Sequence, residues 1–239
     1  MTELSGRTVV VVGGGSGIGR AIAEKCLARG ARVVLAGRGA ERLERAAQEL
    51  GDEASAHVAD VTREADVAAL MESVGRFDHL VSSANRPAAG PVSELAHDDV
   101  IAALSTKLVG PLLLAKHGGS RVSADGSFTF FSGFLGWRPS PGGTVQALVN
   151  GGLAHLAQAL AVELAPVRVN AISPGVVGSD VWDSLEPEAR AGVFSGFEQR
   201  ALTGRIGAVG DVADIALLAM TNASINATVL HADGGARLG

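Results

Sequence analysis

The chain has 239 residues, of which 47% are hydrophobic and 19% charged, and its formal net charge at pH 7 is −5. This much apolar material can fill one sizeable core, so we expect a single domain spanning residues 1–239. The 20 lysines and arginines are scattered and outnumbered by 25 acidic residues, which argues against nucleic acid or an anionic membrane as a partner.

Cysteine usage and the first residues bear on the compartment. Cys26 is the single cysteine, so no internal disulfide can form, and no His or Cys spacing matches a zinc site. No basic segment precedes an apolar stretch with a cleavage site, and glycine or proline interrupts apolar runs such as 108–115. We therefore expect a cytoplasmic protein without a membrane span or a structural metal.

Short runs rich in β-branched residues alternate along the chain with longer stretches of helical period. The predicted strands are 8–12, 32–36, a weaker 54–59, 79–83, 127–132, 167–172 and 228–231. The predicted helices include 18–29, 40–50, 100–116, 144–164 and 211–220. This alternation predicts a doubly wound α/β sheet of about seven parallel strands with helices on both faces, in which functional residues follow the strand ends.

A glycine-rich turn follows the first predicted strand. Its sequence, GGGSGIG at 13–19, leads directly into a predicted helix. Glycines let backbone amides approach a pyrophosphate, and the positive end of the following helix stabilises it. The alternative is a plain glycine-rich turn, and Cys26 on the same helix is best explained as a core residue. The residues expected to bind the dinucleotide here are Gly13, Gly15, Ser16, Gly17 and Ile18.

The end of the second predicted strand indicates which dinucleotide binds. An acid there would hydrogen-bond the adenosine ribose and repel a 2′-phosphate, but the sequence reads Leu35-Ala36-Gly37-Arg38. A guanidinium at Arg38 can bind a phosphate with two parallel hydrogen bonds. The sequence therefore favours NADP(H) over NAD(H), with a solvated surface arginine as the alternative.

Five segments in register resemble the short-chain dehydrogenase/reductase family over essentially the whole chain. They are the turn at 13–19, Asp60-Val61, VSSAN at 81–85, RVNAISPG at 168–175 and VLHADGG at 229–235. The resemblance implies a Rossmann-type fold and a nicotinamide cofactor. The further cofactor-binding residues that it implies are Asp60, Val61, Ser83, Ala84, Asn85, Lys107, Asn150, Pro174, Gly175, Val177 and Ser179.

The family's Ser-Tyr-Lys mechanism with a helper asparagine does not carry over to this chain. The resemblance places Gly133 at the serine, Gln146 at the tyrosine, Asn150 at the lysine and Lys107 at the asparagine. A slip of one residue would put Ser132 at the serine position. No shift supplies a tyrosine, because the chain contains none.

The remaining polar side chains define a candidate catalytic set. Lys107 and Asn150 look like an exchange of the family's asparagine and lysine, so one ammonium could still lie near the ribose or act as the acid, aided by a lowered pKa. The alternative for Lys107 is a surface lysine with its ammonium in solvent. Gln146 can donate a hydrogen bond but cannot deliver a proton. We expect Lys107, Ser132, Gln146 and Asn150 to shape the reaction site.

The resemblance also implies a mobile substrate-covering segment at about 179–200, which includes Trp182. Trp182 is either a substrate contact or a packing residue. Phe134, Leu135 and Trp137 are expected to line the same crevice and to favour an apolar ligand.

Three functions remain open from the sequence. The first is an NADP(H)-dependent oxidoreductase acting on a small carbonyl or alcohol substrate. The second is an inactive NADP(H)-binding protein that serves as a sensor, scaffold or partner subunit. The third is a non-redox enzyme, such as an isomerase or cyclase, that uses the same pocket.

The apolar helix at 144–164 bears on assembly. In the resembled family this helix mediates subunit contacts, which implies a homodimer or homotetramer. The alternative is a helix buried against the sheet of a monomer.

Overall fold

The computed structural model describes residues 4–239. A parallel sheet of seven strands runs in the order β3-β2-β1-β4-β5-β6-β9, and β7 and β8 form a separate pair. The bounds are β1 (Thr8–Val12), β2 (Arg32–Gly37), β3 (Ala54–Val58), β4 (Phe77–Ser82), β5 (Val122–Phe131), β6 (Arg168–Pro174), β7 (Val177–Gly178), β8 (Gly207–Ala208) and β9 (Val229–Ala232). The predicted doubly wound parallel sheet is confirmed.

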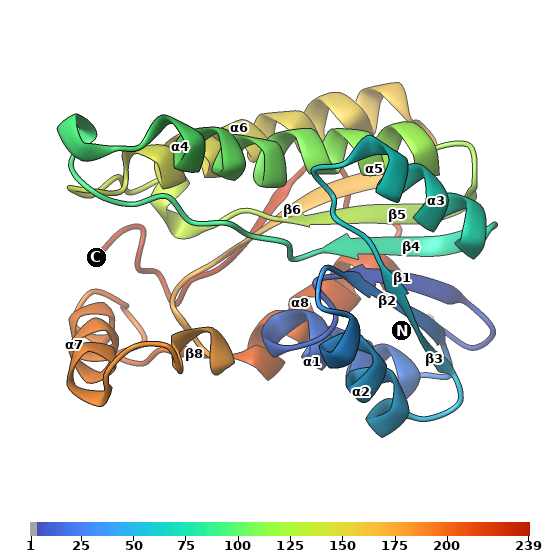
Figure 1. The fold of residues 1–239 in the computed structure, drawn as a ribbon, viewed down its shortest axis with the longest axis horizontal. Coiled ribbons are helices and arrows are strands. Elements are labelled where there is room, and N and C mark those ends of the chain that lie inside the picture. The colour runs from blue at the N-terminus through green and yellow to red at the C-terminus, as the bar shows by residue number, and fades with distance from the viewer. Residues whose placement is uncertain (1–3) are drawn as a thin grey trace.

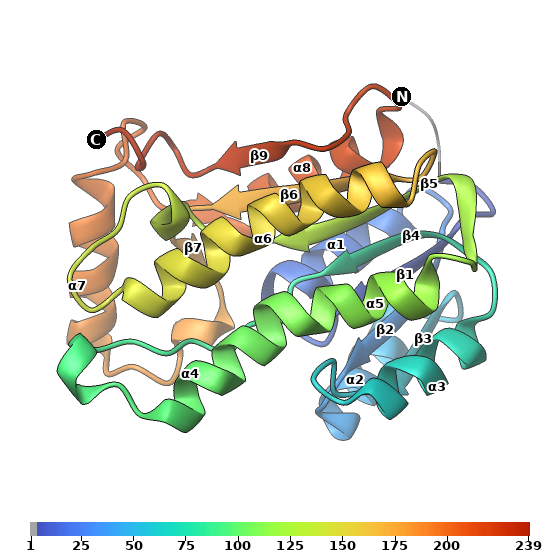
Figure 2. The same cartoon turned by 90° about the horizontal axis from the view of Figure 1, so that it is seen from above.

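Helices cover both faces of the sheet (Figures 1 and 2). Helices α3 to α6 lie on one face, α1, α2 and α8 lie on the other, and α7 stands beyond the carboxyl ends of the strands. The bounds are α1 (Gly17–Leu27), α2 (Ala40–Leu50), α3 (Glu64–Val74), α4 (His97–Leu104), α5 (Gly110–Gly118), α6 (Thr144–Glu163), α7 (Pro187–Glu198) and α8 (Val209–Thr221).

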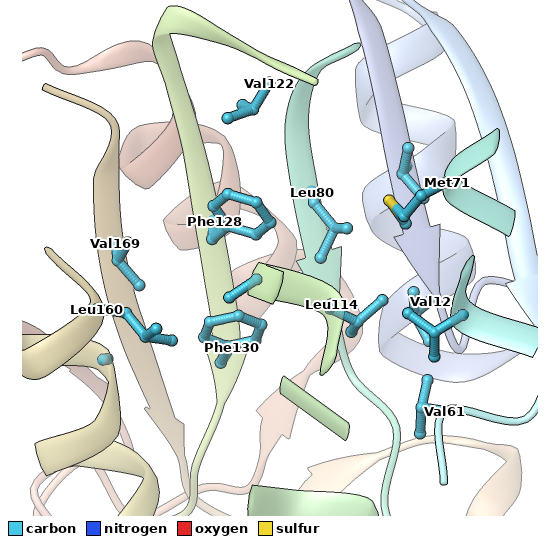
Figure 3. Packing of buried hydrophobic residues seen from close by; sticks show 14 of the residues in the cluster. Val12, Val61, Met71, Leu80, Leu114, Val122, Phe128, Phe130, Leu160 and Val169 are labelled. Atoms are coloured by element: carbon cyan, nitrogen blue, oxygen red, sulfur yellow. The ribbon is translucent and has the colours of Figure 1, made fainter. Parts of the chain in front are cut away.

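The core between the sheet and helices α3, α5 and α6 is aliphatic and contains aromatic side chains from β4 and β5 (Figure 3). Phe128 packs edge to face against Phe77 and stacks on Phe130, with distances between ring centroids of 6.0 Å and 6.1 Å. Leu114 of α5 and Leu160 of α6 pack in the same cluster. Each fully buried side chain of this size contributes roughly 1.5–3 kcal/mol, so this layer holds the strands that end at the cleft described below.

The opposite face carries a second core. Ile22 and Cys26 of α1 pack there with strand residues such as Val9 and Val11. Because β1 is covered on both sides, it reads as a continuous apolar run without alternation. Burial raises the pKa of the Cys26 thiol to about 12. Cys26 is therefore a core residue, as expected.

The helix predicted at 100–116 is interrupted. Between α4 and α5 lies a π-helical turn, Ser105–Val109, and α5 then begins at Gly110 with Pro111 in its first turn. A Cβ at Gly110 would lie 3.0 Å from a methyl carbon of Val61, so glycine allows close packing there. Sequence period alone does not report such a widened turn, because the apolar spacing continues through it.

Helix α6 is a core helix. By length and composition its 20 residues could cross a membrane, but 44% of that stretch is buried within the structure. Its contacts are with β5, β6 and the neighbouring helices, and Val149, Leu153 and Leu160 are buried. A helix that packs in this way onto a sheet needs no membrane to explain its hydropathy.

Candidate functional site

A cleft of about 700 Å³ opens at the carboxyl ends of the central strands. This is where a doubly wound sheet binds its ligand. Most of the predicted cofactor residues line it: Gly13, Gly15, Ser16, Gly17, Ile18, Arg38, Asp60, Val61, Ser83, Ala84, Asn85, Lys107, Pro174 and Ser179. Ser132 lines it as well, whereas Gln146, Asn150, Gly175 and Val177 are not among its lining residues. The roles of all these residues in binding stay predictions.

At the glycine-rich turn, backbone atoms form the wall of the cleft. Gly13 has a φ of +84° and Gly17 a φ of +52°, conformations that favour glycine. A Cβ on Gly13 would lie 2.6 Å from the hydroxyl oxygen of Ser83, and a Cβ on Gly19 would overlap the carbonyl oxygen of Gly13. This end of the cleft is therefore a backbone cradle at the N-terminus of α1, which suits a pyrophosphate.

Strand β4 supports the same turn. The amide of Ser83 donates to the carbonyl oxygen of Val12 at 2.9 Å, and its hydroxyl donates to the same oxygen at 3.2 Å. Ala84 and Asn85 follow along the cleft wall. The segment VSSAN thus lies where the sequence predicted, although it keeps only Ala84 of the resembled family's pattern.

Two arginines, Arg38 and Arg42, border the cleft next to the glycine-rich turn, on the side where the adenosine is predicted to bind. Arg38 follows β2 and Arg42 lies in the first turn of α2, and both border the same space. Neither guanidinium forms a hydrogen bond or a close ion pair with any residue in 4–239, which leaves both available to an anion. Arg42 was missed by the sequence analysis, although its i+4 spacing from Arg38 was the signal that could have found it.

Asp60 closes this end of the cleft. Burial alone would raise the pKa of Asp60, but the amide and hydroxyl of Thr62 donate to its Oδ1 at 2.9 and 2.7 Å and Arg38 is nearby. These interactions lower the pKa of Asp60 below its usual value. The carboxylate is therefore ionised at neutral pH and able to accept hydrogen bonds from a ligand.

Lys107 lines the cleft from the π-helical turn Ser105–Val109. The residue is 5% exposed, and its Nζ donates to the carbonyl oxygens of Phe131 (2.6 Å) and Ser132 (3.1 Å) and to Oδ1 of Asn150 (3.4 Å). Burial lowers its pKa to about 8. The alternative of a surface lysine is therefore wrong, because the ammonium is held inside the protein.

Asn150 and Ser132 complete a cluster around Lys107. The Ser132 hydroxyl donates to the carbonyl oxygen of Asn150 at 2.9 Å. A Cβ on Gly133 would lie 2.8 Å from Nδ2 of Asn150, so a side chain at 133 would require a shift of this amide. Lys107 and Asn150, both predicted to shape the reaction site, are thus in contact, Lys107 from η2, the turn Ser105–Val109, and Asn150 from α6.

Gln146 lies one turn before Asn150 on α6. Its Nε2 is buried and, among residues 4–239, has no hydrogen-bond acceptor. An unpaired buried amide donor costs free energy, so Gln146 is a candidate to meet a polar atom of a ligand.

The structure corrects the expectation for the aromatic residues. Phe134, Leu135 and Trp137 do not line the cleft. Phe134 packs edge to face on Phe197 of α7, with 5.5 Å between the ring centroids. Trp137 packs on His231, with 4.7 Å between the ring centroids. The short turn Phe134–Gly136 after β5 directs the Phe134 ring towards α7 and the Trp137 ring towards β9.

The segment after β6 reaches the cleft through Pro174, Ser179, Asp180 and Val181. Gly175 packs against Phe197, and Val177 is buried in the core beneath the sheet. The indole of Trp182 donates to the carbonyl oxygen of Val177 at 2.7 Å and packs on Phe194 at 5.9 Å, which makes it a packing residue in this structure. Thr106, Asp180 and Val181 are lining residues that the sequence did not indicate.

Metal binding is not indicated by the side chains. Within residues 4–239, no group of three or more His, Cys, Asp and Glu side chains is placed to hold a metal ion. The cleft instead combines a glycine turn, free guanidinium groups and one buried ammonium.

Comparisons with known proteins agree with this geometry. A family model described as enoyl-(acyl carrier protein) reductase matches residues 12–237. The short-chain dehydrogenase/reductase ucsE of Acremonium sp is 33% identical over 98% of this chain and 96% of its own length.

Two solved structures are similar over nearly the full chain. A small-chain dehydrogenase in complex with NADPH has a TM-score of 0.86 at 31% identity, covering 98% of this chain and 100% of that one. The MalC reductase/Diels-Alderase of Malbranchea aurantiaca has a TM-score of 0.92 at 26% identity, covering 99% and 98%. The NADPH in the first of these is the cofactor that the sequence favoured.

Proposed function

Because this chain belongs to the short-chain dehydrogenase/reductase family, we propose that it is an NADP(H)-dependent oxidoreductase that acts on a small carbonyl or alcohol substrate with an atypical active site. The observation that carries the proposal is one cleft that joins the bare glycine turn and two free guanidinium groups to a buried ammonium. The cofactor would supply or accept the hydride.

The cofactor half of the proposal depends on charge and backbone access. Gly13, Gly17 and Ile18 present backbone to the pyrophosphate at the positive end of α1. Arg38 and Arg42 would hold the 2′-phosphate, while the ionised Asp60 would accept hydrogen bonds from the adenine. The structure of a 31% identical relative with NADPH supports the choice of cofactor.

The reaction half depends on Lys107 and Gln146. A pKa of about 8 makes the Lys107 ammonium an effective acid near neutral pH, and its contact of 3.4 Å with Asn150 is the longest and most easily exchanged for a substrate oxygen. Gln146 lies one turn before Asn150 on α6, and a substrate that extends past the cleft lining would accept a hydrogen bond from its unpaired Nε2. Ser132 and Asn150 would position the ammonium through their own hydrogen bond.

Cofactor titration followed by a substrate screen tests this function. We expect the purified protein to bind NADPH at least about tenfold more tightly than NADH, and to oxidise NADPH steadily with some carbonyl compound. If neither dinucleotide binds, the cleft is not a cofactor site and the proposal is wrong. If NADPH binds but no carbonyl consumes it, the protein is better described as a cofactor-binding sensor, scaffold or partner subunit.

A non-redox reaction is the second candidate, and one observation favours it. The similar MalC structure is described as both a reductase and a Diels-Alderase, so its name joins a reduction to a cycloaddition. In this chain the corresponding outcome would be conversion of a substrate with the cofactor unchanged. Product analysis with and without NADPH separates the two reactions.

Assembly and location complete the proposal. We propose a homodimer or homotetramer formed through helices α4, α5 and α6. Their exposed apolar residues are Ile101, Leu112, Leu148 and Val162. Light scattering that reports a 24.1 kDa particle would contradict this. The single reduced Cys26 fits a cytoplasmic protein, and the segment 179–200 is proposed to cover the substrate.

A further inference from the structure

The segment after β7 brings a carboxylate to the phosphate-binding turn. Asp180 lines the same cleft as Gly17 and Ile18. A Cβ built on Gly17 would lie 3.1 Å from Oδ1 of Asp180. Gly17 is the first residue of α1, so this carboxylate stands at the positive end of the helix.

The carboxylate of Asp180 has no ion-pair partner among the residues that the structure describes. It also forms no hydrogen bond with any of these residues, and it is exposed to the solvent of the cleft. Arg20, the arginine in the first turns of α1, is already paired with Glu24 at 3.1 Å and Glu49 at 2.5 Å. Asp180 therefore faces the partial positive charge of the α1 N-terminus, and the unpaired guanidinium of Arg42 borders the same cleft.

A bound pyrophosphate would use that same partial charge. We propose that Asp180 is an internal competitor for the pyrophosphate and thereby sets the affinity of this site for the dinucleotide. This inference rests on the proposed NADP(H) site. Two phosphate charges on the turn would repel the carboxylate, so binding either displaces Asp180 or is weakened by it.

Displacement of Asp180 would reach the segment that is proposed to cover the substrate. Asp180 opens the short helical turn that ends at Trp182. The Trp182 indole is anchored on Val177 and packs against Phe194 of α7. We expect a movement of Asp180 to shift Trp182 and, through its contact with Phe194, to reach α7.

The test compares Asp180→Asn with the matched control Asp183→Asn. Asp183 lies in the same segment, is paired with Arg190 at 2.9 Å and does not line the cleft. The ligands are NADP+ and 2′-AMP, which carries the adenosine 2′-phosphate without a pyrophosphate, both measured by calorimetry. In a Trp137→Phe background Trp182 is the only tryptophan, and its emission reports on the segment.

We expect Asp180→Asn to bind NADP+ about 3- to 10-fold more tightly than the wild type, with 2′-AMP affinity unchanged. Asp183→Asn should stay within about twofold, because an exposed ion pair contributes little. Saturation with NADP+, and not with 2′-AMP, should change the emission of Trp182. Binding by Asp180→Asn where the wild type binds too weakly to detect would also support the proposal.

Other outcomes overturn it. Equal or weaker NADP+ binding by an Asp180→Asn protein with wild-type thermal unfolding removes the competitor role while leaving the proposed function intact. An equal gain for NADP+ and 2′-AMP places the effect outside the pyrophosphate position. Absence of NADP+ binding to every variant overturns the proposed function and this inference with it.

Discussion

The two ends of the cleft are built on different principles. The phosphate end is made of backbone. A Cβ at Gly13, Gly17 or Gly19 would come close to neighbouring atoms, so these positions carry no side chain. The reaction end is made of side chains, in which Lys107 and Asn150 meet across two helices. The first carries the glycine turn that resembles the family's, whereas the second is built without a tyrosine, because the chain contains none.

The difference shows which parts of such a site tolerate replacement of their residues by others. A backbone cradle fails if one Cβ is added, because steric overlap cannot be relieved by choosing another rotamer. A hydrogen-bonded ammonium can be supplied from a different helix, provided that its acceptors are in place. Each prediction below probes one end of the cleft.

Gly19→Ala should have the largest effect. The new Cβ would overlap the carbonyl oxygen of Gly13, so we expect the free energy of unfolding to fall by about 1–3 kcal/mol and NADPH affinity to fall more than about 100-fold. Calorimetry and thermal unfolding measure both. Gly210→Ala is the control, because a Cβ there meets nothing within 4 Å. Retained NADPH affinity in Gly19→Ala would show that the turn is not the pyrophosphate site.

Lys107→Met tests the reaction end. The carbonyl oxygens of Phe131 and Ser132 lose their shared donor, so we expect unfolding to become easier by about 1–3 kcal/mol and turnover to fall about 100-fold. Lys116→Met is the control, since Lys116 is an exposed residue paired with Glu64. Unchanged NADPH affinity and unchanged turnover in Lys107→Met would eliminate a functional role for this ammonium.

The pH dependence of stability should reveal the same buried ammonium. Its pKa is about 8 in the folded protein and near the ordinary lysine value of 10.5 when unfolded, so the unfolded chain binds more protons between these values. The free energy of unfolding of the wild type, relative to Lys107→Met, should therefore rise as pH increases from 8 to 10.5, by up to roughly 3 kcal/mol. Denaturant titrations of both proteins over this range measure it, and a flat difference contradicts it.

Arg38→Ala probes the adenosine end. Loss of one of two guanidinium groups should weaken NADPH binding about 10- to 30-fold and leave NADH binding unchanged, because only NADPH carries the 2′-phosphate. Arg42→Ala should act in the same direction with a smaller effect, and Arg45→Ala, which does not line this cleft, serves as the control. Equal losses for both dinucleotides would mean that Arg38 does not select between them.

Gln146→Leu should have the smallest effect on stability. Removal of a buried donor without an acceptor should raise the free energy of unfolding by about 0.5–1 kcal/mol, while turnover falls because the substrate oxygen loses a hydrogen bond. Thermal unfolding and steady-state kinetics separate these opposite changes. A destabilised protein with normal turnover would indicate that Gln146 serves packing alone.

The cofactor end could be predicted almost completely from the sequence. The glycine turn, Arg38 and Asp60 are local features, each placed directly after a strand whose apolar run is visible in the sequence. In a parallel sheet all such positions meet at one edge, so the strand order was sufficient to bring them together. Arg42 was not predicted because it lies inside α2 and not directly after a strand.

The reaction end was predicted only in part. Lys107 and Asn150 were named as candidates from the resemblance, but their hydrogen bond, the π-helical turn that carries Lys107 and the burial of Lys107 depend on tertiary contacts. Phe134 and Trp137 were placed wrongly, because a short turn after β5 sets the direction of both rings. Asp180 was not noticed, since only the folded segment brings it to Gly17.

The sequence by itself determined the sheet, the glycine cradle and the absence of a tyrosine acid, because apolar period, glycine position and composition are local properties of the chain. The tertiary structure decided that Lys107 is buried among acceptors, that Gln146 lacks one, and that Asp180 faces the phosphate-binding turn. Burial and hydrogen-bond pairing depend on which distant segments come together, and no local pattern records that.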